Sequence, residues 1–259
     1  ILTLSLNGPI VSNFNRSLQS NIVRFIDPEL VRKYLNKIKK INPKILIINI
    51  NSPGGTVTAV ASLEAIISEF KQETETEVYF YSNEILASGG YWIATSGSKI
   101  FANYGSIIGS IGVSGPSWYY FDKPMSISTG LLGKEIQTKN GIYIFDQNAG
   151  PSKDLYNPFR KPTTKELDHL QNIVLEIYND FIIKVSESRK IEIDVIKNDI
   201  GALIFTSKQA KENFLIDDVI DYNNLIKKII KENNYSNYQI LRIKIKQGFL
   251  EKYLESYIG

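Results

Sequence analysis

The stretch Lys44–Ile50 (KILIINI) restricts the fold more than any other part of this sequence. It is a continuous apolar run rich in β-branched residues, and such a run is typical of a strand that is buried on both faces of a parallel sheet. The pattern before and after it predicts further strands at 1–6, 78–81 and 99–102 and helices that begin at Pro28, Thr56 and Ala87. Asp27 is placed to cap the first of these helices. Strands that alternate with helices predict an α/β fold of repeated β-α-β units, with a mostly parallel sheet and flanking helices.

The second half of the chain predicts one long helix and several short elements. Apolar residues recur at helical spacing over residues 163–188. Short strands are expected at 203–205 and 217–220, with a short helix at 207–213 between them. The tail from Leu225 is rich in Lys and Asn and shows no clear period, so no element is predicted there.

The composition excludes several classes of site. The chain of 259 residues has no Cys, so a disulfide, a thiolate zinc site and a thiol nucleophile are excluded, and its single His excludes a His cluster. We therefore expect no metal and no cofactor. Lys and Arg number 30 against 27 Asp and Glu, and no basic stripe dominates, so we do not expect a nucleic-acid partner. The longest apolar stretch is far shorter than the roughly 20 residues of a membrane-spanning helix.

The first candidate site is the segment Asn51–Gly55, which lies between the buried strand and a predicted helix. The carboxyl end of a strand is where open α/β sheets bind ligands, and two glycines leave backbone N–H groups accessible. The segment is either a plain turn or a site for an anion or an oxyanion. It is not a phosphate-binding Walker loop, because the Lys-Ser/Thr pair is missing.

The second candidate site is Ser88, which stands where the strand 78–81 leads into a small-residue helix. Ser88 is either a nucleophile, with the N–H of Gly89 beside it, or a helix cap. The only His, His169, falls on the polar side of the helix 163–188, so we expect it to face solvent. A Ser-His-Asp triad is therefore not expected, and a Lys is the alternative base.

Four short motifs in order give the chain a resemblance to a known family. They are Asn-Ser-Pro-Gly-Gly (51–55), Ala-Ser-Gly-Gly-Tyr (87–91), Gly-Ser-Ile-Gly-Val (109–113) and Gly-x-x-Lys-Asp (150–154). Together with the segment 201–221, they resemble the signal peptide peptidase A family, also called protease IV. The resemblance covers roughly residues 1–222, so we expect a catalytic domain over 1–222 and a C-terminal extension of unclear role over 223–259.

The resemblance implies a fold like that of the Clp protease and crotonase superfamily and a Ser-Lys catalytic dyad. Position by position, Ser88 matches the nucleophile and Lys153 the general base. Gly55 and Gly89 match the backbone donors of the oxyanion hole, and Ser110 matches the hydroxyl that orients the lysine.

A lysine base sets a condition on its surroundings. With its ordinary pKa of about 10.4 a lysine is protonated at neutral pH, and burial is what lowers that value. The apolar residues that suit this purpose are Ile107, Ile108, Ile111 and Val113. Lys134 and Lys139 are rival candidates for the base and fit the motif less well. The connection 114–149 is longer than the family's usual one.

The function that the resemblance implies is a serine endopeptidase acting on extended peptides, with remnant signal peptides among its substrates. A crotonase-type acyl-CoA enzyme and a non-catalytic peptide-binding scaffold are the alternatives. The family also implies a homo-oligomeric ring or dome in which the lysine reaches a neighbouring subunit's serine, and the aromatic residues 118–121 suit such a contact. Its N-terminal membrane anchor is absent from this sequence, which begins at Ile1. We expect a membrane-associated protein with an extracytoplasmic or periplasmic catalytic domain, and a cytoplasmic location stays open.

Overall fold

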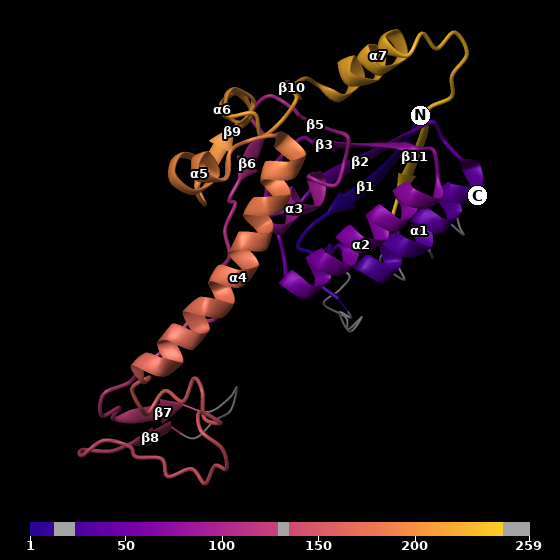
Figure 1. Cartoon of the computed structure of the whole chain (residues 1–259). Coiled ribbons are helices and arrows are strands. Elements are labelled where there is room, and N and C mark those ends of the chain that lie inside the picture. Colours follow the sequence, from indigo (N-terminus) through magenta and orange to yellow (C-terminus); the bar gives the residue numbers. More distant parts are fainter. Residues whose placement is uncertain (13–23, 129–134, 246–259) are drawn as a thin grey trace. The chain divides into compact units, whose positions relative to one another are not determined.

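A computed structural model describes residues 1–12, 24–128 and 135–245 of the chain. The chain divides into two compact units (Figure 1). Unit 1 comprises Ile1–Gly112 and Asp180–Gly259, and unit 2 comprises Val113–Asn179. This division follows compactness, whereas the boundary expected at residue 222 follows the resemblance to a family, and that boundary stays a prediction.

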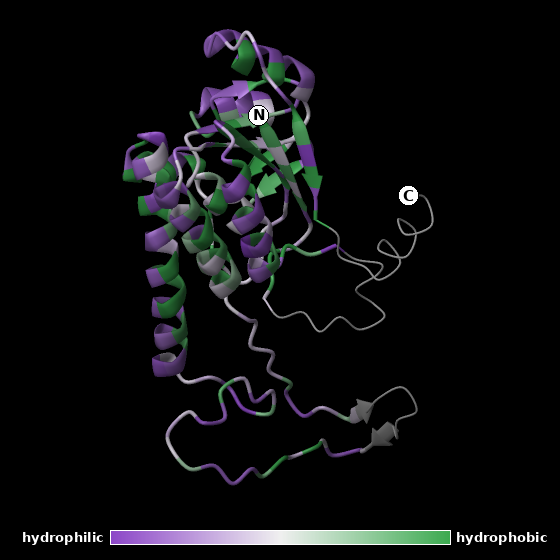
Figure 2. Cartoon of the chain, turned by 90° about the vertical axis from the view of Figure 1, so that its right-hand side faces the viewer, coloured by the Kyte–Doolittle hydropathy of each residue, from purple (hydrophilic) through white to green (hydrophobic). Residues whose placement is uncertain are grey.

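Unit 1 is built on a six-stranded sheet in which all neighbouring strands are parallel. The strand order is β10-β5-β3-β2-β1-β11. The strands are β1 (Leu2–Asn7), β2 (Ile45–Asn51), β3 (Glu77–Ser82), β5 (Lys99–Ala102), β10 (Asp218–Val219) and β11 (Leu241–Lys244). The apolar run predicted as a strand over Lys44–Ile50 forms β2, which is central and buried along nearly its whole length. Figure 2 shows that hydrophobic residues dominate these strands. The predicted parallel α/β architecture is therefore confirmed.

Helices cover both faces of this sheet. Side chains alternate along each strand, so Ile47 and Tyr79 face one way while Ile48 and Phe80 face the other. The face of Ile47 and Tyr79 packs against α7 (Tyr222–Glu232). The other face is left for the apolar sides of the crossover helices α1 (Pro28–Ile41) and α2 (Val57–Glu73), which pack side by side (Figure 1). As predicted, the carboxylate of Asp27 caps α1 by accepting the N–H of Leu30 at 3.0 Å.

Unit 1 also contains a second, smaller sheet, one strand of which ends directly before Ser88. Its strands are β4 (Ile85–Ala87), β6 (Ile107–Gly109) and β9 (Ile204–Thr206), with β4 and β6 parallel and β9 antiparallel to β6. The short helix α3 (Gly89–Ala94) follows β4, so the helix predicted from residue 87 begins two residues later. The sequence did not predict β4 and β6, because three-residue strands are too short to show a period.

The remaining elements complete the two units. Unit 1 also contains α5 (Ile193–Val195), a π-helical turn (Ile196–Ile200) and α6 (Ser207–Glu212). Unit 2 contains the antiparallel pair β7 (Ser126–Ser128) and β8 (Glu135–Gln137). The long predicted helix is α4 (Thr164–Arg189). Within the described residues, no helix combines the length and the hydropathy that crossing a membrane requires.

Candidate functional site

The loop after β2 is held to β4 by the buried residue Ser52. The N–H of Ser52 donates to the carbonyl of Ile85 at 2.8 Å, and its own carbonyl accepts the N–H of Ala87 at 3.0 Å. The Ser52 hydroxyl accepts the N–H of Gly54 at 3.2 Å. These bonds place the two glycines of the loop beside the residue that follows β4, which is Ser88.

Ser88 has an unusual backbone for a residue with a side chain. Its φ is 52° and its ψ is −126°, and it makes no side-chain capping bond to α3. Its N–H donates to the carbonyl of Gly109 at 2.9 Å, and its carbonyl accepts the N–H of Trp92 at 2.9 Å. A non-glycine residue in such a conformation costs about 1–3 kcal/mol, and such strain concentrates at functional sites. The half-buried hydroxyl of Ser88 therefore stands at the end of β4 without serving as a helix cap.

Two glycine N–H groups lie next to Ser88. A Cβ placed on Gly54 would lie 3.0 Å from both the Ser88 Oγ and the Gly89 nitrogen, and a Cβ placed on Gly89 would lie 3.4 Å from the Gly55 nitrogen. Gly89 is the first residue of α3, so its N–H has no acceptor within the helix. Neither N–H donates to a backbone carbonyl in the part of the chain that the structure describes. Two free donors beside a hydroxyl can stabilise the oxyanion that forms when that hydroxyl attacks a carbonyl.

Ser110 comes next to Ser88 through the register of the small sheet. Ala87 pairs with Gly109, so the residues after them leave two neighbouring strands side by side. Ser110 is half-buried, has a φ of 53°, and donates its N–H to the carbonyl of Leu203 at 2.7 Å. Unit 1 thus brings together four of the predicted site residues, which are Gly55, Ser88, Gly89 and Ser110.

A polar cluster that was not predicted from the sequence holds α3 against α2 and α4. The Trp92 Nε1 donates to Glu64 of α2 at 2.9 Å, and the Lys184 Nζ of α4 lies 2.6 Å from the same carboxylate. The Trp92 ring stacks on Phe181 with a centroid separation of 4.7 Å. Four residues from three helices therefore fix the helix that directly follows Ser88. No local pattern in the sequence indicated this, because the partners lie far apart in the chain.

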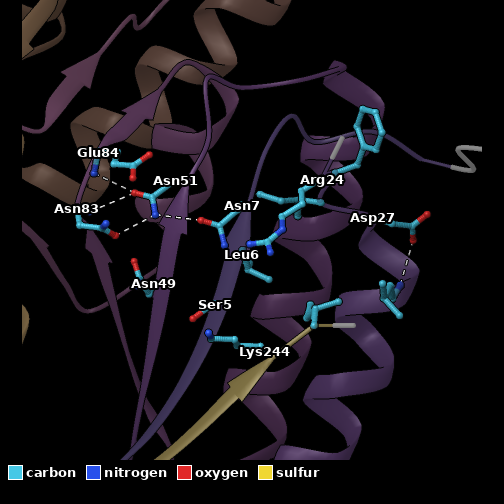
Figure 3. A pocket seen from close by; sticks show the side chains of 14 residues that line it. Ser5, Leu6, Asn7, Arg24, Asp27, Asn49, Asn51, Asn83, Glu84 and Lys244 are labelled. Atoms are coloured by element: carbon cyan, nitrogen blue, oxygen red, sulfur yellow. Dashed lines mark hydrogen bonds between the residues drawn. The ribbon is translucent and has the colours of Figure 1, made fainter. Parts of the chain in front are cut away.

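An amide network occupies the carboxyl ends of β1, β2 and β3 (Figure 3). The Asn51 amide donates to Asn7 at 3.1 Å and to Asn83 at 2.9 Å, while its oxygen accepts the N–H of Glu84 at 3.0 Å. These residues line a pocket of ≈ 260 Å³ together with Asn49 and other residues. The recurrence of Asn at strand ends was a signal that the sequence analysis did not use. Because Asn51 directly precedes Ser52, the network also fixes the start of the glycine loop.

The predicted base, Lys153, lies in unit 2 and is exposed there. It belongs to a turn in which its N–H donates to the carbonyl of Gly150 at 3.3 Å. Of the apolar residues expected around it, Ile108 and Ile111 are buried in unit 1, whereas Ile107 is 41% exposed. Unit 2 by itself therefore does not bury Lys153.

The other expected residues are placed as follows. Lys139 is exposed in unit 2, and Lys134 lies outside the described residues. His169 is exposed on α4, which confirms that it faces solvent. Among the described residues, no three His, Cys, Asp or Glu side chains gather to hold a metal ion.

Comparison with known proteins decides the family. The model of peptidase family S49 matches residues 70–236, which is more than half of the chain. The chain belongs to peptidase family S49. The matched residues include Ser88, Ser110 and Lys153. The family is one of peptidases, in agreement with the resemblance that the four motifs indicated.

Individual relatives of this S49 chain are also proteases by name. A protein of Methanocaldococcus jannaschii called "Putative protease" is 30% identical over 84% of this chain and 66% of its own length. The "Putative signal peptide peptidase SppA" of Enterococcus faecium is 26% identical over 100% of the chain and 71% of its own length. "Protease 4" of Salmonella typhi is 26% identical over 73% of the chain, which spans only 28% of that protein. The chain thus spans about two thirds of the first two relatives and a smaller part of the third.

Proposed function

We propose that this S49 chain is a serine endopeptidase that cleaves extended peptides through a dyad of Ser88 and Lys153. The observation that carries the proposal is the half-buried Ser88 with its positive φ, flanked by the N–H groups of Gly55 and Gly89, which donate to no backbone carbonyl among the described residues. A hydroxyl and two donors in this arrangement suit acyl transfer better than enolate chemistry. The crotonase-type alternative loses support because the matching family and the named relatives are proteases.

The proposed reaction proceeds in two steps. The neutral amine of Lys153 accepts the proton of the Ser88 hydroxyl while Oγ attacks the peptide carbonyl. The N–H groups of Gly55 and Gly89 hold the resulting oxyanion, and the protonated lysine returns its proton to the leaving amine. Water, activated by the same amine, then hydrolyses the acyl-enzyme and frees Ser88. The Ser110 hydroxyl accepts a hydrogen bond from an N–H of the amine, which limits the amine's rotation and leaves its lone pair free to face Ser88.

Covalent labelling with a fluorophosphonate tests the nucleophile. We expect the wild-type protein to be labelled at Ser88 and to cleave fluorescein-labelled casein, and Ser88→Ala to lose both properties. The matched control is Ser98→Ala, because Ser98 is exposed in the same unit and its hydroxyl has no described partner. Labelling and cleavage that persist in a folded Ser88→Ala protein contradict the proposal and favour the non-catalytic scaffold or another nucleophile.

We further propose that the dyad forms between subunits of a homo-oligomer. Lys153 is exposed, and the same unit exposes large apolar side chains, with Tyr119 at 67%, Tyr143 at 65% and Phe145 at 91%. Aromatic residues are enriched in the core of protein–protein interfaces, where side chains that are exposed on the single chain become buried. Contact with another subunit would cover these residues and could supply the burial that a lysine base requires.

Co-expression of two inactive variants tests completion between subunits. Ser88→Ala and Lys153→Ala chains should each be inactive alone, and mixed oligomers should regain part of the activity. Recovery is expected because some interfaces pair an intact Ser88 with an intact Lys153. Verified mixed oligomers without any recovery would show that the dyad closes within one chain.

Remnant signal peptides and a membrane-associated, extracytoplasmic location are part of the same proposal. Their support is the resemblance and the name of the Enterococcus faecium relative. Incubation with synthetic signal peptides and with unrelated peptides of equal length tests the substrate, since faster cleavage of the former is expected. Fractionation of the source cells tests the location.

A further inference from the structure

The turn that carries Lys153 is attached through Asp154 to a charged cluster in unit 2. Asp154, which directly follows Lys153, accepts two hydrogen bonds from Arg160, at 2.6 Å from Nε and 2.8 Å from Nη2. Arg160 also donates from Nη1 and Nη2 to both oxygens of Glu166, at 2.9 Å and 2.8 Å. Two bidentate pairs on one guanidinium fix its position and its plane far better than a single contact.

Glu166 belongs to the first turn of α4 and ties the cluster to that helix. Its carboxylate accepts the N–H of Thr163 at 2.9 Å, and the Thr163 hydroxyl accepts the N–H of Glu166 at 3.2 Å. Hydrogen bonds from Arg160 and from the Thr163 backbone hold the pKa of Glu166 well below its usual range. Asp154 directly follows Lys153, so the lysine's neighbour in the chain is joined through Arg160 to the first turn of α4.

The guanidinium is also covered by an aromatic ring. The Arg160 Cζ lies 5.0 Å from the centroid of the Trp118 ring, and the Trp118 Nε1 donates to the carbonyl of Asn157 in the same turn region at 3.1 Å. The Arg160 side chain is 28% exposed and that of Glu166 only 6%. The guanidinium cannot swing out without losing four hydrogen bonds and this stacking contact.

We propose that Arg160 is a positioning residue for Lys153, on which it acts through Asp154. This inference rests on the proposed role of Lys153 as the base. A backbone fixed at the residue next to a long flexible side chain limits the region that its amine can reach. Proton transfer depends on that reach, because the amine must come within hydrogen-bond distance of the Ser88 hydroxyl.

Steady-state kinetics of two variants test the proposal, using a fluorogenic peptide that the wild-type protein cleaves. Asp154→Asn releases the turn while leaving the Arg160–Glu166 pair in place, and Arg160→Ala removes the whole cluster. We expect kcat to fall about 100-fold in Arg160→Ala, the size of effect that a misplacement of about 1 Å can produce, and less in Asp154→Asn. KM should change little in either variant, since neither Arg160 nor Asp154 is among the groups proposed to bind the peptide.

Matched controls separate positioning from general damage to unit 2. Lys161→Ala removes the neighbouring positive charge, whose Nζ lies 5.4 Å from the centroid of the Tyr120 ring. Asp146→Asn removes a carboxylate that accepts a bond from Asn157 at 3.1 Å and does not contact Arg160. Both controls should keep wild-type kcat. Guanidinium ion added to Arg160→Ala should restore part of kcat, whereas Arg160→Lys should stay impaired because an ammonium group cannot form two bidentate pairs.

The outcomes separate this inference from the proposed function. An inactive Lys153→Ala together with wild-type kcat in folded Arg160→Ala and Asp154→Asn would overturn the positioning role alone. A fully active Lys153→Ala would overturn the dyad itself. If Arg160→Ala does not fold, Asp154→Asn decides: a lower kcat at unchanged KM supports the inference, and a kcat equal to that of Asp146→Asn overturns it.

Discussion

Replacement of Gly54 by Ala tests whether the space in front of Ser88 is needed for activity. Gly54 has a φ of +110°, and a Cβ there would lie 2.8 Å from the Ser88 Cβ and 3.0 Å from the Gly89 nitrogen. Ordinary contact begins at 3.4 Å, so the new methyl would have to move these atoms apart by 3.4 − 2.8 = 0.6 Å and 3.4 − 3.0 = 0.4 Å. Both displaced groups belong to the proposed site.

The expected loss of activity follows from these displacements. Loss of one oxyanion donor costs about 100- to 1,000-fold in kcat, and a methyl against the Gly89 nitrogen would obstruct one of the two donors. We therefore expect Gly54→Ala to lower kcat/KM at least about 100-fold. The strained backbone should also lower the free energy of unfolding by about 1–3 kcal/mol.

Gly105 provides the matched control. It has a φ of +84° in the same unit, but a Cβ there would meet nothing within 4 Å. Gly105→Ala should therefore show a comparable loss in urea unfolding with no loss of kcat/KM. Peptidase kinetics and urea unfolding of both variants distinguish strain from obstruction. Wild-type kcat/KM in Gly54→Ala would show that neither the hydroxyl nor the donor is used as proposed.

Three further predictions address other parts of the molecule. Ser110→Ala should lower kcat about 10- to 1,000-fold in the peptidase assay by removing the group that orients the base, and an unchanged kcat would leave Ser110 as a turn residue only. Activity should rise with pH, because only a neutral amine accepts a proton, and His169→Ala should give the same pH profile; a profile that changes in this variant would favour a His base. Hydrogen bonds from Lys211 and Lys228 lower the pKa of Asp218 to about 2, so its contribution to stability is present above about pH 4 and is lost as the pH falls toward 2. Asp218→Asn should therefore lower the free energy of unfolding by about 1–2 kcal/mol at pH 7 and should flatten its decline in acid, as urea unfolding at several pH values will measure.

The architecture of unit 1 could be predicted because its main strands are long and its helices amphipathic. Within the predicted strand Lys44–Ile50, residues 45–48 and Ile50 are buried as expected, whereas Lys44 precedes β2 and is exposed. The cap by Asp27 was likewise local, with Pro28 fixing the start of the helix. By contrast, α7 (Tyr222–Glu232) was not predicted, because its many Lys and Asn residues obscured the helical spacing of its apolar residues. These apolar residues are buried against the sheet, which the sequence alone does not show.

The candidate site could be predicted only in part, and the reason is distance along the chain. The motifs indicated Ser88 and the glycines one by one, whereas their proximity depends on a bridge between Ser52 and Leu86 that joins two separate strands. The role of Glu64 behind α3 depends on Lys184, which lies 120 residues further on. In the cluster around Arg160, the guanidinium contacts Asp154 and Glu166, each six residues away in the chain. Of these residues, only Asp154 belongs to one of the motifs.

The two units supply different parts of the proposed chemistry, and each part is held in place by its own contacts. Unit 1 holds a hydroxyl between two donors through the Ser52 bridge and the packing of Trp92. A serine hydroxyl alone is a weak nucleophile, so this half would bind a carbonyl without attacking it quickly. Unit 2 holds Lys153 on a turn clamped by Arg160, where an exposed amine has no substrate to act on. In a protease built this way, activity would depend on bringing two preformed halves together rather than on reshaping either, and an oligomer that joins them would switch on proteolysis only when assembled.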